Sequence, residues 1–170
     1  MDFSSSGLAL AVENHVATLW LDRPGKLNAI STGMWDDFVR AMEVVAANDE
    51  IRAVVIAARG KSFCVGIDLA SLGSAPDLST ASGCLQQLGQ TQRCQDGISA
   101  IANCPVPVIA AIHGHCLGAG VDLATACDIR LASEDALFGV RETKIGIVAD
   151  VGTLQRLPGG VSAGRVAELA

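Results

Sequence analysis

Residues 105–132 read PVPVIAAIHGHCLGAGVDLATACDIRLA, and this stretch decides the fold. The apolar run at 105–112 predicts a buried strand, with its prolines near the start, where a missing N–H is best tolerated. The segment HGHCLGAG is a glycine-rich turn, after which residues 118–127 predict a helix and DIRLAS predicts the next strand. Strand, helix and strand in this order are typical of an α/β fold.

The sequence on either side of this stretch continues the alternation. Further strands are predicted at residues 15–21, at residues 51–57 and at ALFGV, and helices at residues 31–48 and 84–103. The small and polar residues 73–83 predict a mobile loop. No internal repeat or linker divides the sequence, so we expect residues 1–170 to form a single domain.

Composition excludes several classes of protein. Half of the residues are hydrophobic and 18% are charged, which is typical of a globular chain rather than a disordered one. The net charge of −6 argues against a nucleic-acid partner. No apolar run approaches the ~20 residues that a membrane span needs. The N-terminus resembles neither a signal nor a transit peptide, so we expect a cytoplasmic protein.

The cysteines show no metal-binding pattern. They form no CxxC pair and no zinc spacing, and no metal site is expected; their positions are 64, 84, 94, 104, 116 and 127. Apolar neighbours favour reduced, packed thiols. A nucleophilic Cys116 is a weaker alternative, based on its closeness in sequence to His113 and His115.

Two glycine-bearing turns share one pattern. AVVIAARGKSFCVGIDLA and PVIAAIHGHCLGAGVDLA each leave a buried strand and are expected to open a helix. The first turn of a helix has unpaired N–H groups, and glycine lets a ligand approach that backbone. Two such turns facing each other could form an oxyanion hole, although each could also be an ordinary strand-to-helix turn. Neither turn fits a nucleotide-binding fingerprint.

Three carboxylates stand in apolar, glycine-containing surroundings: Asp122, Glu142 and Asp150. Acids are rarely buried unless they are paired or needed, so we interpret the three as candidates for proton transfer. Each also has a simpler explanation. Asp122 could complement a helix dipole, Glu142 could pair with the adjacent Arg141, and Asp150 could be the N-cap of a helix. If the three acids converge, repulsion and burial would raise at least one pKa.

The sequence resembles the crotonases, that is, the enoyl-CoA hydratase/isomerase superfamily. The matching segments, in order, are DRPGKLNAIS, ARGKSFCVGIDL, PVIAAIHGHCLGAGVDLATACDIRLAS, ALFGVRE and IVADVGTLQRLP. The resemblance implies a spiral of strand–strand–helix units, assembled as trimers or hexamers. It also implies an acyl-CoA substrate and no separate cofactor, since coenzyme A is part of the substrate. A mitochondrial or peroxisomal location is the alternative to the cytoplasm.

The resemblance also assigns roles to residues. The oxyanion donors would be the backbone N–H groups of Ile67 and Ala119, and Lys26 would lie near the nucleotide end of CoA. Ala119 stands where a glycine is usual, and its methyl group narrows the site. The residues that would line the acyl-CoA are Gly66, Asp68, Leu69 and Gly120.

The acids separate the branches of the superfamily. Hydratases usually have glutamate at the positions of Asp122 and Glu142, whereas GVDL and ADVG resemble the delta(3,5)-delta(2,4)-dienoyl-CoA isomerases. In that branch Asp150 and Glu142 would move protons, and Asp122 would tune Glu142 or assist. Two alternatives stay open: hydration of a 2-enoyl-CoA, with Asp150 as a cap, and a non-catalytic acyl-CoA-binding member. The family continues with C-terminal helices, so we expect the chain ending GRVAELA to be truncated.

Overall fold

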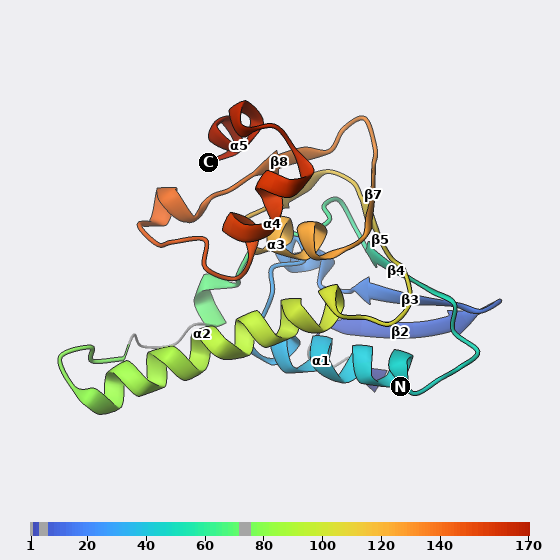
Figure 1. Cartoon of the computed structure of the whole chain (residues 1–170), viewed down its shortest axis with the longest axis horizontal. Coiled ribbons are helices and arrows are strands. Elements are labelled where there is room, and N and C mark those ends of the chain that lie inside the picture. Colours follow the sequence, from blue (N-terminus) through green and yellow to red (C-terminus); the bar gives the residue numbers. More distant parts are fainter. Residues whose placement is uncertain (1, 4–6, 72–75) are drawn as a thin grey trace.

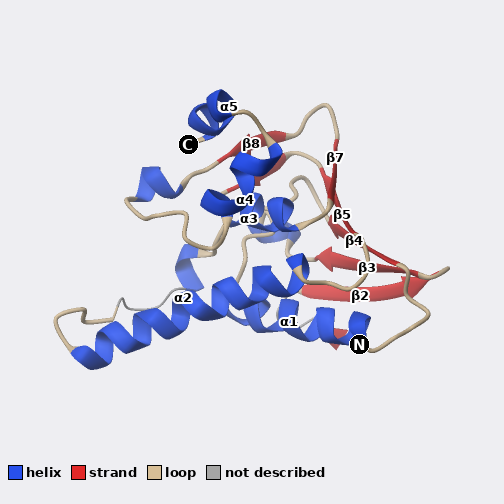
Figure 2. Cartoon of the chain, viewed as in Figure 1, coloured by secondary structure: helices blue, strands red, loops and turns tan. Residues whose placement is uncertain are grey.

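The computed structural model describes residues 2–3, 7–71 and 76–170. Most strands in this part of the chain form one sheet in the order β1-β2-β3-β4-β5-β7, and the other two strands, β6 and β8, form a small second sheet (Figures 1 and 2). The strands are β1 (Asp2–Phe3), β2 (Leu8–Glu13), β3 (Val16–Leu21), β4 (Ala53–Ala58), β5 (Val108–Ile112), β6 (His115–Leu117), β7 (Ile129–Ala132) and β8 (Leu137–Gly139).

Helices connect the strands. The α-helices are α1 (Thr32–Ala46), α2 (Ala81–Ala102), α3 (Ala119–Ala126), α4 (Thr153–Gly160) and α5 (Ala163–Leu169), and the 3₁₀ helices are η1 (Pro24–Lys26), η2 (Leu69–Ser71) and η3 (Glu142–Ile145). Strands β3, β4, β5 and β7 run parallel, with Val16 opposite Ala53 and Ile109 opposite Ile129. Parallel neighbours need crossover connections, and α1, α2 and α3 lie within them. The predicted α/β class is confirmed.

Strand β2 is the main element that the sequence analysis missed. It pairs with β3 along its whole length, from Leu8 opposite Leu21 to Glu13 opposite Val16. Burial along β2 decreases from Leu8, which is buried, to the second half of the strand, which is exposed. The strand LALAVE therefore shows no alternation of buried and exposed residues. The hydrogen bonds of β3 stabilise this strand where its own pattern is weak.

The segment between β4 and α2 differs from the prediction. The first glycine turn opens only the short 3₁₀ helix η2, not an α-helix, so the expectation of two helix starts is wrong for this turn. Of the predicted loop 73–83, residues 73–75 lie outside the described residues, and residues 81–83 form the first turn of α2 instead. Thr80 caps this turn by accepting a hydrogen bond from Gly83 N at 3.0 Å.

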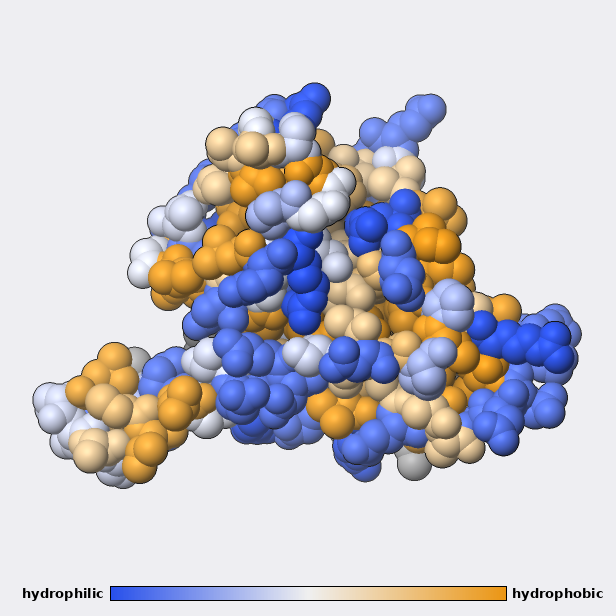
Figure 3. Space-filling model, viewed as in Figure 1, coloured by the Kyte–Doolittle hydropathy of each residue, from blue (hydrophilic) through white to orange (hydrophobic). Residues whose placement is uncertain are grey.

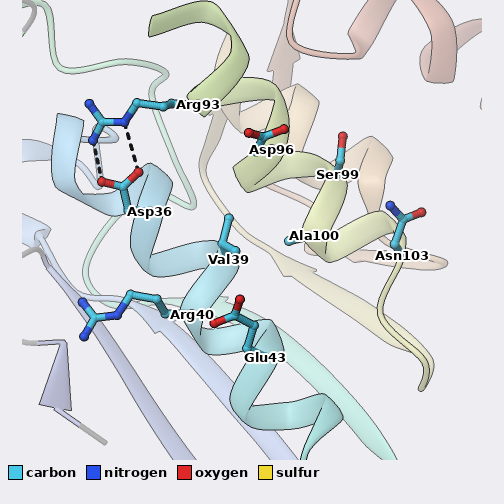
Figure 4. Close-up of a pocket in the computed structure, with 9 residues that line it drawn as sticks. All are labelled: Asp36, Val39, Arg40, Glu43, Arg93, Asp96, Ser99, Ala100 and Asn103. Carbon is cyan, nitrogen blue, oxygen red and sulfur yellow. Dashed lines mark hydrogen bonds and ion pairs between the residues drawn. The ribbon is translucent and has the colours of Figure 1, made fainter. Parts of the chain in front are cut away.

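Helices α1 and α2 lie side by side (Figure 1). A Cβ atom at Gly97 would lie 2.8 Å from the carbonyl oxygen of Trp35, so glycine permits the close contact of the two helices. Arg93 and Asp36 form a two-pronged ion pair across them, at one end of a hollow of about 510 Å³ (Figure 4). The N-terminal half of α2 projects beyond the body of the molecule (Figure 1).

The buried thiols are inert in this fold. Cys64, Cys116 and Cys127 are buried, and burial raises the pKa of Cys64 and of Cys127 to about 12. His113 and His115 hydrogen-bond to Gly60 O and the Ser62 hydroxyl, not to Cys116. The alternative of a nucleophilic Cys116 is therefore wrong. The expectation of packed thiols is also wrong for Cys84, which is exposed.

Candidate active site

A cleft of about 900 Å³ lies where the two glycine turns meet α2 and the segment from Arg141 to Val151. It brings together the two predicted oxyanion donors and all three predicted acids. The residues that line it are Trp35, Val65, Gly66, Ile67, Leu69, Pro76, Gln87, Gln90, Thr91, Cys94, Gly118, Ala119, Asp122, Arg141, Glu142, Ile145, Gly146, Ile147, Val148, Ala149, Asp150 and Val151.

The turn before α3 leaves one N–H group free. The carbonyl oxygen of Gly118 accepts a hydrogen bond from Val121 N at 2.7 Å, inside the helix. A trans peptide points its C=O and its N–H in opposite directions, so the N–H of Ala119 points away from the helix. In the described part of the chain this N–H has no acceptor, which makes it available to a ligand.

The turn after β4 leaves a second N–H group free by a different arrangement. Ile30 N donates to Gly66 O at 2.8 Å, and Asp68 N donates to Ile30 O at 2.8 Å. Both bonds lie on one side of Ile67, so its own N–H points to the other side. No acceptor for it is found among the described residues.

The two turns approach each other closely. A Cβ atom at Gly66 would lie 3.7 Å from Ala119 N, and one at Gly118 would lie 3.6 Å from the Cα of Gly66. Both glycines have positive φ, at 103° and 52°. A side chain at either position would be strained by this backbone conformation. The two free N–H groups therefore lie on adjacent backbone segments, as stabilisation of a developing oxyanion requires.

Asp122 is the buried acid of the site, with 1% of its surface exposed. Its Oδ1 accepts a hydrogen bond from Thr153 N at 2.6 Å, so this residue of α3 satisfies the first N–H of α4. The pKa of Asp122 is raised to about 6, chiefly by burial; hydrogen bonding to Thr153 opposes the rise, and the charge of Glu142 adds to it. The carboxyl group is poised to exchange a proton near neutral pH.

Glu142 lies over the second glycine turn. A Cβ atom at Gly118 would lie 3.4 Å from its Oε1. Its Oε2 accepts a hydrogen bond from the backbone N–H of Arg141 at 2.8 Å. Among the ion pairs of the described residues, none joins the two side chains. The alternative of a surface ion pair between Arg141 and Glu142 is therefore wrong, and Glu142 lines the cleft instead.

Asp150 is exposed, which corrects the expectation that all three acids have apolar surroundings. Its backbone oxygen accepts a hydrogen bond from Gln95 Nε2 at 2.8 Å, which ties this segment to α2. The N-cap of α4 is Gly152, so the alternative of Asp150 as N-cap is also wrong.

The predicted substrate-lining residues divide into two groups. Gly66 and Leu69 line the cleft, whereas Asp68, Gly120 and Lys26 are not among the described lining residues. The carboxylate of Asp68 accepts a hydrogen bond from the Arg23 guanidinium at 2.8 Å, which lowers the pKa of Asp68. A Cβ atom at Gly120 would lie 2.7 Å from a backbone oxygen of the first turn, so Gly120 serves packing. Lys26 is exposed at the end of η1.

One wall of the cleft was missed by the sequence analysis. It comes from α2, where the residues Gln87, Gln90, Thr91 and Cys94 face the cleft. Their spacing of i, i+3, i+4 and i+7 marks one face of a helix and could have indicated this wall. Burial, with the charge of Asp150, raises the pKa of Cys94 to about 11, so its thiol is neutral at pH 7.

Comparison with known proteins identifies the family and the fold of the chain. The enoyl-CoA hydratase/isomerase family model matches residues 11–170. A peroxisomal delta(3,5)-delta(2,4)-dienoyl-CoA isomerase of Arabidopsis thaliana is 43% identical over 166 residues, which cover 93% of this chain and 59% of the relative. The mitochondrial human enzyme of the same name is 43% identical over 154 residues, which cover 87% and 46%.

A solved structure agrees with these matches. A Thermobifida fusca protein in complex with CoA has a TM-score of 0.84 and 32% identity, covering 98% of this chain and 64% of that one. The chain therefore belongs to the enoyl-CoA hydratase/isomerase family, which is a family of enzymes, and has the crotonase fold. It spans about half the length of the curated relatives that it matches.

Two features are absent from the described residues. No helix among them is long and apolar enough to cross a membrane. Within the same residues, no three His, Cys, Asp or Glu side chains are grouped so that they could hold a metal ion.

Proposed function

We propose that the chain is an isomerase that converts 3,5-dienoyl-CoA to 2,4-dienoyl-CoA in the β-oxidation of fatty acids. The observation that carries the proposal is one cleft lined by Asp122, Glu142 and Asp150 together with the donor turns at Ile67 and Ala119. The names of the Arabidopsis and human relatives support the choice of reaction.

The reaction needs two proton transfers and no change in atoms. The thioester oxygen accepts hydrogen bonds from the N–H groups of Ile67 and Ala119. A carboxylate removes a proton from C2, and the electron pair spreads over the diene and the thioester oxygen as a dienolate. A carboxylic acid then adds a proton at C6, which leaves double bonds at C2 and C4. Glu142 and Asp150 are the two proton carriers of the proposal.

Asp122 has a supporting role in this scheme. Its burial and its nearness to Glu142 disfavour two full negative charges side by side. A proton held on Asp122 removes the repulsion between the two neighbouring carboxyl groups. In this scheme Asp122 thus acts on Glu142 through its charge, from the wall of the same cleft.

The test replaces each proton carrier by its amide. In Asp150→Asn and Glu142→Gln, we expect kcat for a 3,5-dienoyl-CoA, followed by the absorbance of the conjugated product, to fall by roughly 10²–10⁴-fold. Asp135→Asn, which changes an exposed acid bonded to Ser133 outside the cleft, is the matched control. Wild-type rates in both amide variants would refute the proposal.

Isotope exchange assigns the two roles. In D₂O, a variant that lacks only the C6 proton donor still exchanges the C2 proton without forming product. A variant that lacks the C2 base does neither. The variant that exchanges without isomerising therefore identifies its missing residue as the donor.

Hydration of a 2-enoyl-CoA is the second candidate. It is favoured by the electrostatic coupling of Asp122 with Glu142, which leaves Asp150 outside the pair. In this reaction the two coupled acids would activate water. Crotonyl-CoA hydration, assayed beside diene isomerisation on the same preparation, separates the candidates. Binding of CoA thioesters with neither reaction would indicate the non-catalytic alternative.

The ligand, assembly and location complete the proposal. We propose an acyl-CoA ligand without a further cofactor, in line with the CoA-bound neighbour, and with Lys26 near the nucleotide end of CoA. The trimer or hexamer expected for the family stays a prediction, and so does a cytoplasmic location. The names of the relatives favour the mitochondrial or peroxisomal alternative.

A further inference from the structure

A buried amide connects the loop at residues 23–30 to the first glycine turn. Asn28 is fully buried and uses its whole side chain: Oδ1 accepts from Arg23 N at 2.8 Å, and Nδ2 donates to Arg59 O and Ser62 O, both at 2.8 Å. Its backbone has a φ of 57°, in the left-handed region where asparagine is among the better-tolerated residues. The amide therefore fixes the beginning of the turn that carries Ile67.

The same loop fixes the end of that turn. Ile30, two residues after Asn28, donates to Gly66 O and accepts from Asp68 N, so it holds the peptides on both sides of Ile67. Arg23 adds a bridge, because its guanidinium binds Ala29 O in the loop and the carboxylate of Asp68 in the turn. The direction of the Ile67 N–H thus depends on where this loop lies.

We propose that Asn28 is a positioning residue for the oxyanion donor at Ile67. The inference rests on the proposed function, because the isomerisation uses the Ile67 N–H as a donor, and Asn28 is proposed to orient that N–H. Asn28 is fully buried and is not among the described residues that line the cleft. It acts through the Ile30–Gly66 hydrogen bond, which sets the peptide plane whose N–H faces the cleft.

The test is Asn28→Asp, which keeps the oxygen that accepts from Arg23 N. In place of the Nδ2 group, which donates to Arg59 O and Ser62 O, the variant has a second oxygen that cannot donate. We expect kcat to fall roughly 10–100-fold with KM little changed, because loss of a whole oxyanion donor costs about 10²–10³ and a misaimed donor costs less. Asn48→Asp, the same chemical change at an exposed turn, is the matched control.

A spectroscopic readout separates positioning from general damage. Infrared difference spectra of bound 2,4-hexadienoyl-CoA report the thioester C=O stretch, which a well-aimed donor shifts to lower frequency. In Asn28→Asp we expect this band to move back toward the frequency of the free thioester. An unchanged band, with or without a fall in kcat, overturns the inference.

The outcomes also separate this inference from the proposed function. If the wild-type chain does not isomerise dienes but its C=O band still responds to Asn28→Asp, the reaction is wrong and the positioning role stands. If the wild type isomerises and neither band nor kcat responds, the positioning role is wrong and the reaction stands. Should Asn28→Asp not fold, Arg23→Gln tests the same link from the Asp68 side and is expected to shift the band in the same direction.

Discussion

Asp122 combines a structural contact and a titrating group in one side chain. It accepts the first N–H of α4, and its folded-state pKa is about 6, above the ordinary 3.8. The folded chain therefore holds this proton more tightly than the unfolded chain does. The free energy of unfolding therefore decreases as pH rises from about 4 to 6, because the buried carboxyl group of Asp122 becomes ionised. Above pH 6 this decrease reaches its full value of about 3 kcal/mol.

Asp122→Asn removes this titration and keeps an oxygen that can accept Thr153 N. We expect the free energy of unfolding of the variant, minus that of the wild type, to increase between pH 4 and 6 and then level off. Urea unfolding at a series of pH values measures the difference. Asp49→Asn, at an exposed position, controls for the loss of a charge. A difference independent of pH would contradict the raised pKa.

At the residue scale, the family resemblance assigned the donor roles to Ile67 and Ala119, and both residues line one cleft in the structure. The local pattern alone indicated two glycine-bearing turns, each after a buried strand. The exposure of Asp150 depends on what packs across from it, and the Asp122–Thr153 bond joins residues 31 apart. No local pattern contains these facts.

At the element scale, α2 has two halves with different surroundings. Gly97 packs against Trp35, whereas a Cβ atom at Gly89 would have nothing within 4 Å. Helix propensity alone makes both glycines weaknesses of the helix, because it takes no account of a neighbouring helix. The helix forms despite them, and its packing against α1 explains one of the two.

Two alanine substitutions in α2 should therefore change the free energy of unfolding in opposite directions. Gly89→Ala is expected to stabilise the chain by up to about 1 kcal/mol through helix propensity. Gly97→Ala is expected to destabilise it, because overpacking typically costs about 1–3 kcal/mol and exceeds that gain. Urea unfolding of the two variants measures both effects. Equal effects would show that the close contact between α1 and α2 is absent in solution.

At the scale of the whole molecule, the surface is unusually apolar in places. Leu78, Leu85 and Leu88 are each at least 60% exposed, at and near the projecting end of α2, where hydrophobic side chains gather (Figure 3). Leu131 and Leu137, on β7 and β8, are also largely exposed. Exposed apolar patches of this kind mark interaction surfaces or sites of aggregation.

We expect the chain to associate with itself as its concentration rises. Sedimentation velocity over a range of concentrations measures this, and Leu85→Gln with Leu88→Gln is expected to weaken it. Gln86→Ala, on the same turn of helix but not apolar, is the control. A monomer at all concentrations, or an unchanged double variant, would show that this surface does not drive association.

The proposed oxyanion donors are backbone groups, and this has a consequence for genetic variation at the site. A saturation mutagenesis scored on turnover would find Ile67 tolerant of many side chains, because every residue except proline keeps the N–H. The intolerant positions would be Gly66 and Gly118, whose φ values restrict the choice, and Asn28. The positions that tolerate few substitutions would thus lie around Ile67, whereas Ile67 itself, which supplies the donor N–H, would tolerate many.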